Sequence, residues 1–219
     1  MPLLRQLLRT LPLPLCALLV ACDAAPPADT TLGAQGNAPA TATTARANAA
    51  VAETLDLADP RDFADARRGL IATPESLAIN MADGSTIWDM PSYDFITGDA
   101  PDSVNPSLWR QAMLNNIHGL FKVTDGVYQV RGFDLSNMSI IPGDSGWIIV
   151  DPLTTRETAS AALDFARQQL GDAPVSAVIF THSHVDHFGG VLAVLETGRN
   201  IPIYAPEGFM QEATSENVL

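Results

Sequence analysis

Cysteine is scarce in this chain of 219 residues, which contains only Cys16 and Cys22, both close to the N-terminus. The rest of the chain therefore has no disulfide available, and its folded part must be stabilised by packing. The same scarcity excludes a thiolate metal site, because cysteine sulfur is the ligand that soft metals prefer.

Positive charge is the second shortage. The chain has 12 Lys and Arg against 25 Asp and Glu, which gives a formal net charge of −13. Nucleic-acid binding depends on clustered basic side chains that contact phosphates, so we expect no nucleic acid among the partners. The acidic residues are dispersed, and we interpret them as a solvated surface that favours solubility.

A long apolar run is missing near the N-terminus. The apolar stretch there extends only from Leu11 to Ala21, which is too short to span a bilayer. It follows Arg5 and Arg9, and a basic segment before a short apolar segment is typical of a secretory signal. We therefore predict a signal peptide over residues 1–21.

The predicted signal ends on Leu19-Val20-Ala21-Cys22, which resembles a bacterial lipobox. The resemblance implies cleavage before Cys22 and attachment of diacylglycerol to its sulfur, so that acyl chains hold the protein at a membrane surface. We accordingly expect a periplasmic protein with membrane attachment through Cys22. Plain secretion, with Cys22 incidental, is the alternative.

Residues 22–50 consist mainly of Ala, Thr, Pro and Gly, with almost no large apolar side chain. Such a composition cannot bury enough surface to offset the entropy of ordering the chain. We predict a disordered tether over residues 22–50, followed by a folded part over residues 51–219.

Short helices are predicted on either side of Pro60, and three longer helical segments are predicted further along the folded part. The first of these three covers 105–117, with Asn105 as its N-cap, and the last covers 189–198. Between them, the segment 154–171 is amphipathic, with Thr154 and Glu157 at capping-box spacing and Gly171 as its end.

Strand-like runs separate and precede these helices. They cover 84–90, 126–133, 137–143, 146–152, 175–180 and 201–205. The run GWIIVD at 146–151 is almost entirely apolar, as for a strand buried on both faces. Because the earlier strands are joined by turns and the last three alternate with helices, we predict an α/β fold with helices packed on a sheet.

Three of the four histidines lie in one short stretch, THSHVDHFGG, at residues 181–190. It directly follows a predicted strand, and alternate side chains of extended backbone point the same way, so His182 and His184 can converge on one ion. Asp186 and His187 follow where the chain bends and can face a second ion. Imidazole and carboxylate ligands suit zinc, iron or manganese. Solvated or locally hydrogen-bonded histidines are the alternative.

This motif, in its strand–loop–helix setting, resembles that of the metallo-β-lactamase superfamily. The resemblance implies an αβ/βα sandwich with a one- or two-metal centre between its sheets and a metal-bound hydroxide. It also implies that His182 and His184 bind the first metal, and that Asp186 and His187 bind the second. We assign Asp186 a catalytic role as well.

Residues 105–163, and RGFDLSN at 131–137 in particular, resemble the alkyl sulfatases of this superfamily. The resemblance runs from about Asp62 onward. It implies a hydrolase with two Zn²⁺ ions that converts long-chain alkyl sulfates, such as dodecyl sulfate, to alcohol and sulfate. Two alternatives remain: another hydrolase of the superfamily, of lactamase or thioesterase type, or a truncated metal-binding lipoprotein without catalysis.

Several other residues have two interpretations each. Asp134 and Asn137 either line the site or serve as turn residues that satisfy backbone groups. Asp151 either supports the metal ligands or is a turn acid. His118 is expected to pack or cap. Four aromatic side chains are expected in the core: Trp109, Phe121, Tyr128 and Trp147.

The resemblance also implies parts that do not appear before Leu219. The family's further acidic and histidine ligands, its sulfate-binding basic groups and its dimer-forming region lie downstream. Three late acids lie on a predicted surface helix and are not assigned as ligands: Glu207, Glu212 and Glu216. We therefore expect residues 51–219 to be the N-terminal portion of an incomplete sandwich, with little activity alone and with homodimerisation only in the full-length protein.

Overall fold

The computed structural model describes residues 38–217. The predicted signal peptide and Cys22 lie outside the described residues, so their assignments stay predictions. Among the residues described, no helix is both long and apolar enough to cross a membrane.

Three helices precede and flank the sheet: α1 (Ala42–Thr54), α2 (Arg61–Arg67) and α3 (Pro106–Asn115). The prediction that order begins near residue 51 is wrong, because α1 begins at Ala42. Its alanine-rich sequence has high helix propensity, and the Thr41 side chain caps the first turn by accepting from the Thr44 N–H. The predicted helix at 105–117 is confirmed as α3, with Asn105 as its N-cap.

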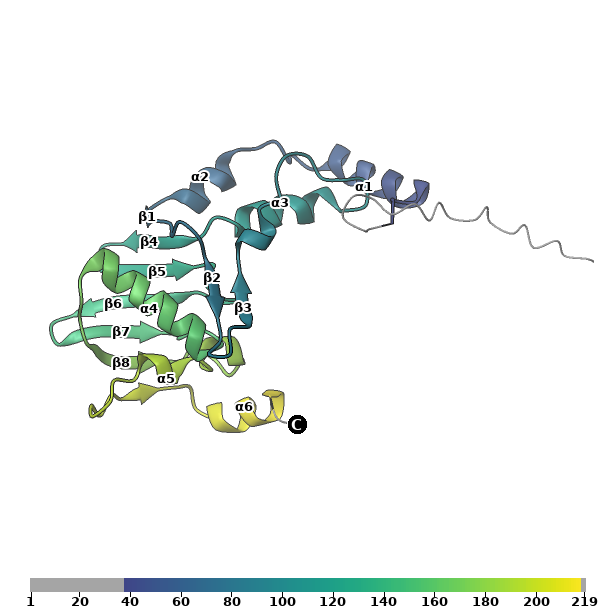
Figure 1. The fold of residues 1–219 in the computed structure, drawn as a ribbon. Coiled ribbons are helices and arrows are strands. Elements are labelled where there is room, and N and C mark those ends of the chain that lie inside the picture. Colours follow the sequence, from purple (N-terminus) through teal and green to yellow (C-terminus); the bar gives the residue numbers. More distant parts are fainter. Residues whose placement is uncertain (1–37, 218–219) are drawn as a thin grey trace, which may run out of the picture.

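A seven-stranded sheet forms the centre of the fold (Figure 1), in the order β1-β4-β5-β6-β7-β8-β9. The strands from β1 to β7 pair antiparallel, and β7, β8 and β9 pair parallel, as predicted for this α/β chain. A separate hairpin joins β2 (Ala78–Asn80) to β3 (Thr86–Asp89). The strands of the main sheet are β1 (Leu70–Ala72), β4 (Gly119–Thr124), β5 (Val127–Arg131), β6 (Met138–Gly143), β7 (Gly146–Val150), β8 (Val175–Ile179) and β9 (Ile203–Tyr204).

Helix α4 (Arg156–Leu170) covers one face of this sheet, and the β2–β3 hairpin packs beside it (Figure 1). Its cap differs by one residue from the prediction. Thr155 is the N-cap and pairs with Thr158, because the backbone N–H and hydroxyl of Thr154 are both bonded to Asp134. The predicted end at Gly171 is confirmed.

The core lies between α4 and the sheet. It includes Leu120, Val130, Met138, Ile140, Ile149, Leu163, Ala166 and Val178. Residues that alternate with these along the strands, such as Ile148 and Val150, are only half-buried. The prediction that 146–151 is buried on both faces is therefore wrong, since one sheet face has no covering layer among the described residues. An incomplete sandwich of the predicted class has this property.

The aromatic predictions hold for Phe121 and Trp147, which are buried, while Tyr128 packs partly buried against the core. Trp109 differs. Its indole N–H donates to the Gly98 carbonyl, and its ring meets Phe95 at a centroid distance of 6.1 Å, outside the core.

The chain after β8 forms two further helices, α5 (Val191–Val194) and α6 (Phe209–Asn217). The helix predicted over 189–198 is confirmed only as these four residues of α5. Phe209 packs its ring on Phe180 and Phe188, at centroid distances of 5.3 Å and 5.2 Å. This contact brings α6 to the edge of the sheet at which β8 ends (Figure 1).

Candidate metal centre

The histidine loop follows β8 at the carboxyl edge of the sheet and contains a short 3-10 turn, η2 (Val185–His187). The ring centroids of His182 and His184 lie 4.6 Å apart, and those of His182 and His187 lie 4.0 Å apart. The imidazoles of the loop therefore lie close together, while the convergence of His182 and His184 on one ion stays a prediction. Their assignment as metal ligands stays a prediction.

Asp151 lies directly beneath this loop, just after β7, and is 7% exposed. Its Oδ1 accepts the Thr181 backbone N–H at 2.8 Å. Its Oδ2 lies 2.6 Å from the Thr181 hydroxyl and 2.8 Å from Nδ1 of His187. Of the two interpretations of Asp151, the structure favours support of the site, because this carboxylate holds the loop and one of its imidazoles.

The hydrogen bonds around Thr181 select the tautomers of two histidines. The Thr181 hydroxyl has one proton, which it donates to Asp151, so its oxygen accepts from Nδ1 of His182 at 2.9 Å. His187 likewise donates a hydrogen bond from its Nδ1–H to the Asp151 carboxylate. Both rings are thereby left with Nε2 as the nitrogen available to a ligand.

Asp186 and His184 complete the predicted set. Oδ2 of Asp186 lies 3.2 Å from Nε2 of His187, so the carboxylate faces the nitrogen left free by Asp151. Nε2 of His184 lies 3.8 Å from Oε1 of Glu216, whose Oε2 accepts the Ser183 hydroxyl at 3.0 Å. Glu216 thus lies beside the loop, although the sequence placed it only on a surface helix.

Asp151, His182 and His187 offer ligand atoms that all lie within 4.8 Å of one another. Nitrogen and oxygen donors at this spacing fit a divalent metal such as zinc. The predicted set contains His184 and Asp186 in place of Asp151. We assign Asp151 to orienting the imidazoles, because its oxygens already accept three hydrogen bonds.

The connection between β5 and β6 also contacts the histidine loop and helps to hold it in place. The Ser136 hydroxyl donates to the Asp186 carbonyl, a contact that the sequence analysis missed because nothing near Ser136 marks it. Asp134 is buried, and its carboxylate bonds Thr154 and Thr158 at the start of α4. Asp134 is therefore a structural acid, as its second interpretation proposed.

Two further candidates lie apart from the imidazole cluster. Asn137 lines a cavity beyond the β5–β6 connection. His118 is half-buried and directs Nδ1 at the Asn116 carbonyl, 2.8 Å away. The prediction that His118 packs or caps agrees with this local contact, and its exclusion from the metal ligands stays a prediction.

Comparison with known proteins identifies the fold. Residues 131–216 match the model of the metallo-beta-lactamase superfamily. The chain is 50% identical over 186 residues to an (R)-specific secondary-alkylsulfatase of Pseudomonas sp. This alignment covers 83% of this chain and 28% of that protein. The chain is 48% identical over 181 residues to the alkyl/aryl-sulfatase BDS1 of Saccharomyces cerevisiae, covering 80% of this chain and 28% of that one.

Comparison with solved structures also finds an alkylsulfatase. The stereoselective inverting sec-alkylsulfatase Pisa1 of Pseudomonas sp. matches with a TM-score of 0.78 and 51% identity over 83% of this chain and 29% of that chain. The chain thus spans less than a third of the length of the relatives it matches. It belongs to the metallo-β-lactamase superfamily and is related along most of its length to alkylsulfatases.

Proposed function

We propose that this protein hydrolyses alkyl sulfate esters in a metal-dependent reaction, with two zinc ions held in part by the histidine loop. The observation that carries the proposal is the paired orientation of His182 and His187 by one buried acid, Asp151, which leaves both Nε2 atoms free for metal. The relationship to alkylsulfatases supplies the substrate class.

Two zinc ions, when bound, would supply a water with a pKa of about 7, so that hydroxide is available at neutral pH. His182 and His184 would hold the first ion, and Asp186 and His187 the second. Asp151 keeps the His187 proton on Nδ1 and, through the Thr181 hydroxyl, the His182 proton on Nδ1. The Ser136 hydroxyl donates to the Asp186 carbonyl and thereby holds the backbone of this predicted ligand.

The test uses the 219-residue chain, loaded with zinc and freed of excess metal. Sulfate released from dodecyl sulfate is followed by ion chromatography, and bound zinc is counted by elemental analysis. We expect bound zinc and slow, chelator-sensitive release, because four protein ligands leave positions around two ions to water. Equal sulfate release by the unaltered chain and by His182→Ala would refute the proposal.

The proposal also includes attachment to a membrane through a lipid on Cys22, in the periplasm of a bacterium. Labelled palmitate should enter the unaltered protein and not Cys22→Ser. Equal labelling of the two would leave plain secretion as the explanation of the N-terminal signal.

A further inference from the structure

A cavity of about 450 Å³ lies beside the β5–β6 connection. We call it the Arg131 cavity, because Arg131 lines it together with apolar side chains from β3, the following turn and α3. Its apolar wall includes Trp88, Met90, Tyr93, Ile96, Leu114 and Ile117. Its volume falls within the range of roughly 300–1,000 Å³ that small-molecule sites occupy.

Arg131 is the cation of this cavity. The lining also includes Asp134, which is 7% exposed and whose carboxylate oxygens accept from Leu135, Thr154 and Thr158. Its Nε donates to Oε1 of Gln129 at 2.7 Å, and its guanidinium carbon lies 4.3 Å from the ring centre of the buried Phe121. Within residues 38–217, no carboxylate pairs with Arg131 and no acceptor contacts its two Nη groups. Gln129 and Phe121 therefore hold the guanidinium in place without neutralising it.

Other partly buried arginines of the chain do have acidic partners. Arg110 contacts Asp62 at 2.8 Å, and Arg167 contacts Glu196 at 2.9 Å. Burial also lowers the pKa of the Arg131 guanidinium, as expected for a cation that has lost water without gaining a carboxylate. A fixed, partly desolvated guanidinium with free Nη groups is well suited to bind an oxyanion through two parallel hydrogen bonds.

One short segment of chain, the β5–β6 connection, contacts both the cavity and the candidate metal centre. Gly132, Asp134, Leu135 and Asn137 line the cavity, while Ser136 between them bonds the carbonyl of Asp186. A molecule in the Arg131 cavity would therefore lie on the other side of the connection that braces the histidine loop.

We propose that the Arg131 cavity binds the alkyl sulfate, with the sulfate oxygens on the Arg131 guanidinium and the alkyl chain against the apolar wall. This inference rests on the proposed function for the identity of the ligand. A cation at one side of an apolar cavity matches both parts of such an amphiphile, and an uncharged alcohol or an alkylammonium ion would match only the chain.

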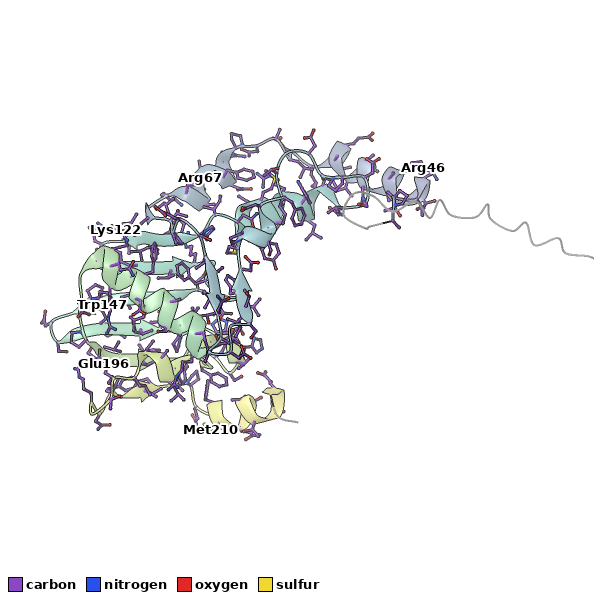
Figure 2. The ribbon with its side chains drawn as sticks, in the orientation of Figure 1. Arg46, Arg67, Lys122, Trp147, Glu196 and Met210 are labelled. Atoms are coloured by element: carbon purple, nitrogen blue, oxygen red, sulfur yellow. The ribbon has the colours of Figure 1, made fainter. Side chains whose placement is uncertain are left out.

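The test is calorimetric titration of the metal-free 219-residue chain, in EDTA, with octyl sulfate below its micelle concentration. Arg131→Gln should weaken binding at least tenfold, and Arg131→Lys should fall in between, because lysine keeps the charge without the two-pronged geometry. Lys122→Gln is the matched control. It removes one positive charge from β4, outside the lining of the cavity, and should leave binding unchanged; Figure 2 shows Lys122 on the left side of the molecule.

The alkyl chain gives a second readout. Shortening octyl to butyl sulfate should weaken binding by about fourfold per methylene group that leaves the apolar wall. Ala112→Phe, which projects a ring into the cavity from α3 without altering Arg131, should also weaken octyl sulfate binding. It tests the site independently if Arg131→Gln proves unstable in thermal melting.

Equal binding of octyl sulfate and octyltrimethylammonium, or equal losses in Arg131→Gln and Lys122→Gln, would overturn the inference. Because the titration is done without metal, it separates the two proposals. Binding that depends on Arg131 can be found even if zinc-dependent hydrolysis fails, and hydrolysis can be found even if Arg131 has no effect on binding.

Discussion

The carboxylate of Asp151 binds the imidazole of His187 through a 2.8 Å hydrogen bond between Oδ2 and Nδ1, although 36 positions of sequence separate the two residues. The bond joins the end of β7 to the loop after β8, and these two strands are parallel neighbours. A single acid on one strand thereby sets the orientation and tautomer of an imidazole on the next.

Asp151→Asn tests this relationship. An amide cannot accept from both His187 and Thr181 at full strength, so the rings lose their fixed tautomers and the affinity for zinc should fall by about 10–100-fold. The measurement is competition with a chromophoric chelator. Asp144→Asn, in an exposed turn, is the control, and equal zinc affinities for the two variants would contradict an orienting role of Asp151.

The histidines offer a matched pair for elemental analysis. His182→Ala removes an imidazole from the cluster and should abolish or strongly reduce bound zinc. His118→Ala removes one whose Nδ1 faces the Asn116 carbonyl, and it should leave the zinc content unchanged. Loss of zinc in both variants, with folding intact by circular dichroism, would mean that His118 belongs to the site.

The sequence predicted what local rules determine. Alternation along an extended segment placed His182 and His184 together, and the apolar runs located the strands of the sheet. The long-range partners followed no local rule. Asp151 was found to hold His187 only once the parallel pairing of β7 and β8 was known, and Ser136 reaches Asp186 across a turn.

Two predictions about helix ends were wrong, one because of a long-range contact and one because of helix propensity. The predicted cap at Thr154 failed because Asp134, a buried acid from another connection, uses both the backbone N–H and the hydroxyl of that residue. The boundary of the tether failed because alanine favours helix even where it buries little, so α1 begins at Ala42.

Glu196 provides a pH prediction. Burial opposes its ionisation, but hydrogen bonds from Arg199 and the Val175 N–H, with the charges of Arg199 and Arg167, outweigh burial and lower its pKa. A lowered pKa contributes stability above the ordinary value of 4.5 that is lost as the pH falls through the folded-state value. Figure 2 shows Glu196 at the edge of the sheet opposite the histidine loop.

We therefore expect Glu196→Gln to lower the free energy of unfolding by about 0.5–1 kcal/mol at pH 7. The difference from the unaltered chain should shrink below pH 4.5, because protonation of Glu196 removes from the unaltered chain the ion pairs that the Gln variant lacks at every pH. Urea unfolding at pH 7 and pH 3.5 measures it. A difference that is the same at both values would show that the effect is not electrostatic.

Gly190 tests how closely the loop packs on the start of α4. A Cβ at this position would meet the carbonyl oxygens of Pro152 and Thr155 and the side chain of Ala159. Since these are backbone atoms or buried groups, Gly190→Ala should destabilise the fold by about 1–3 kcal/mol. Unchanged thermal melting would show that the turn after the histidines can move away at little cost.

Glu216 gives the last prediction, because its carboxylate reaches the histidine loop from α6. Nε2 of His184 lies 3.8 Å from Oε1, and both side chains are well exposed, at 62% and 40%. A carboxylate near this nitrogen favours Nδ1 of His184 as the metal ligand, but solvent weakens the interaction. Glu216→Gln should therefore reduce zinc affinity only a fewfold, about fivefold at most and less than Asp151→Asn. Glu212→Gln, on the same helix, controls for the loss of one negative charge, and equal affinities in these two variants would show that the Glu216 contact does not reach the metal.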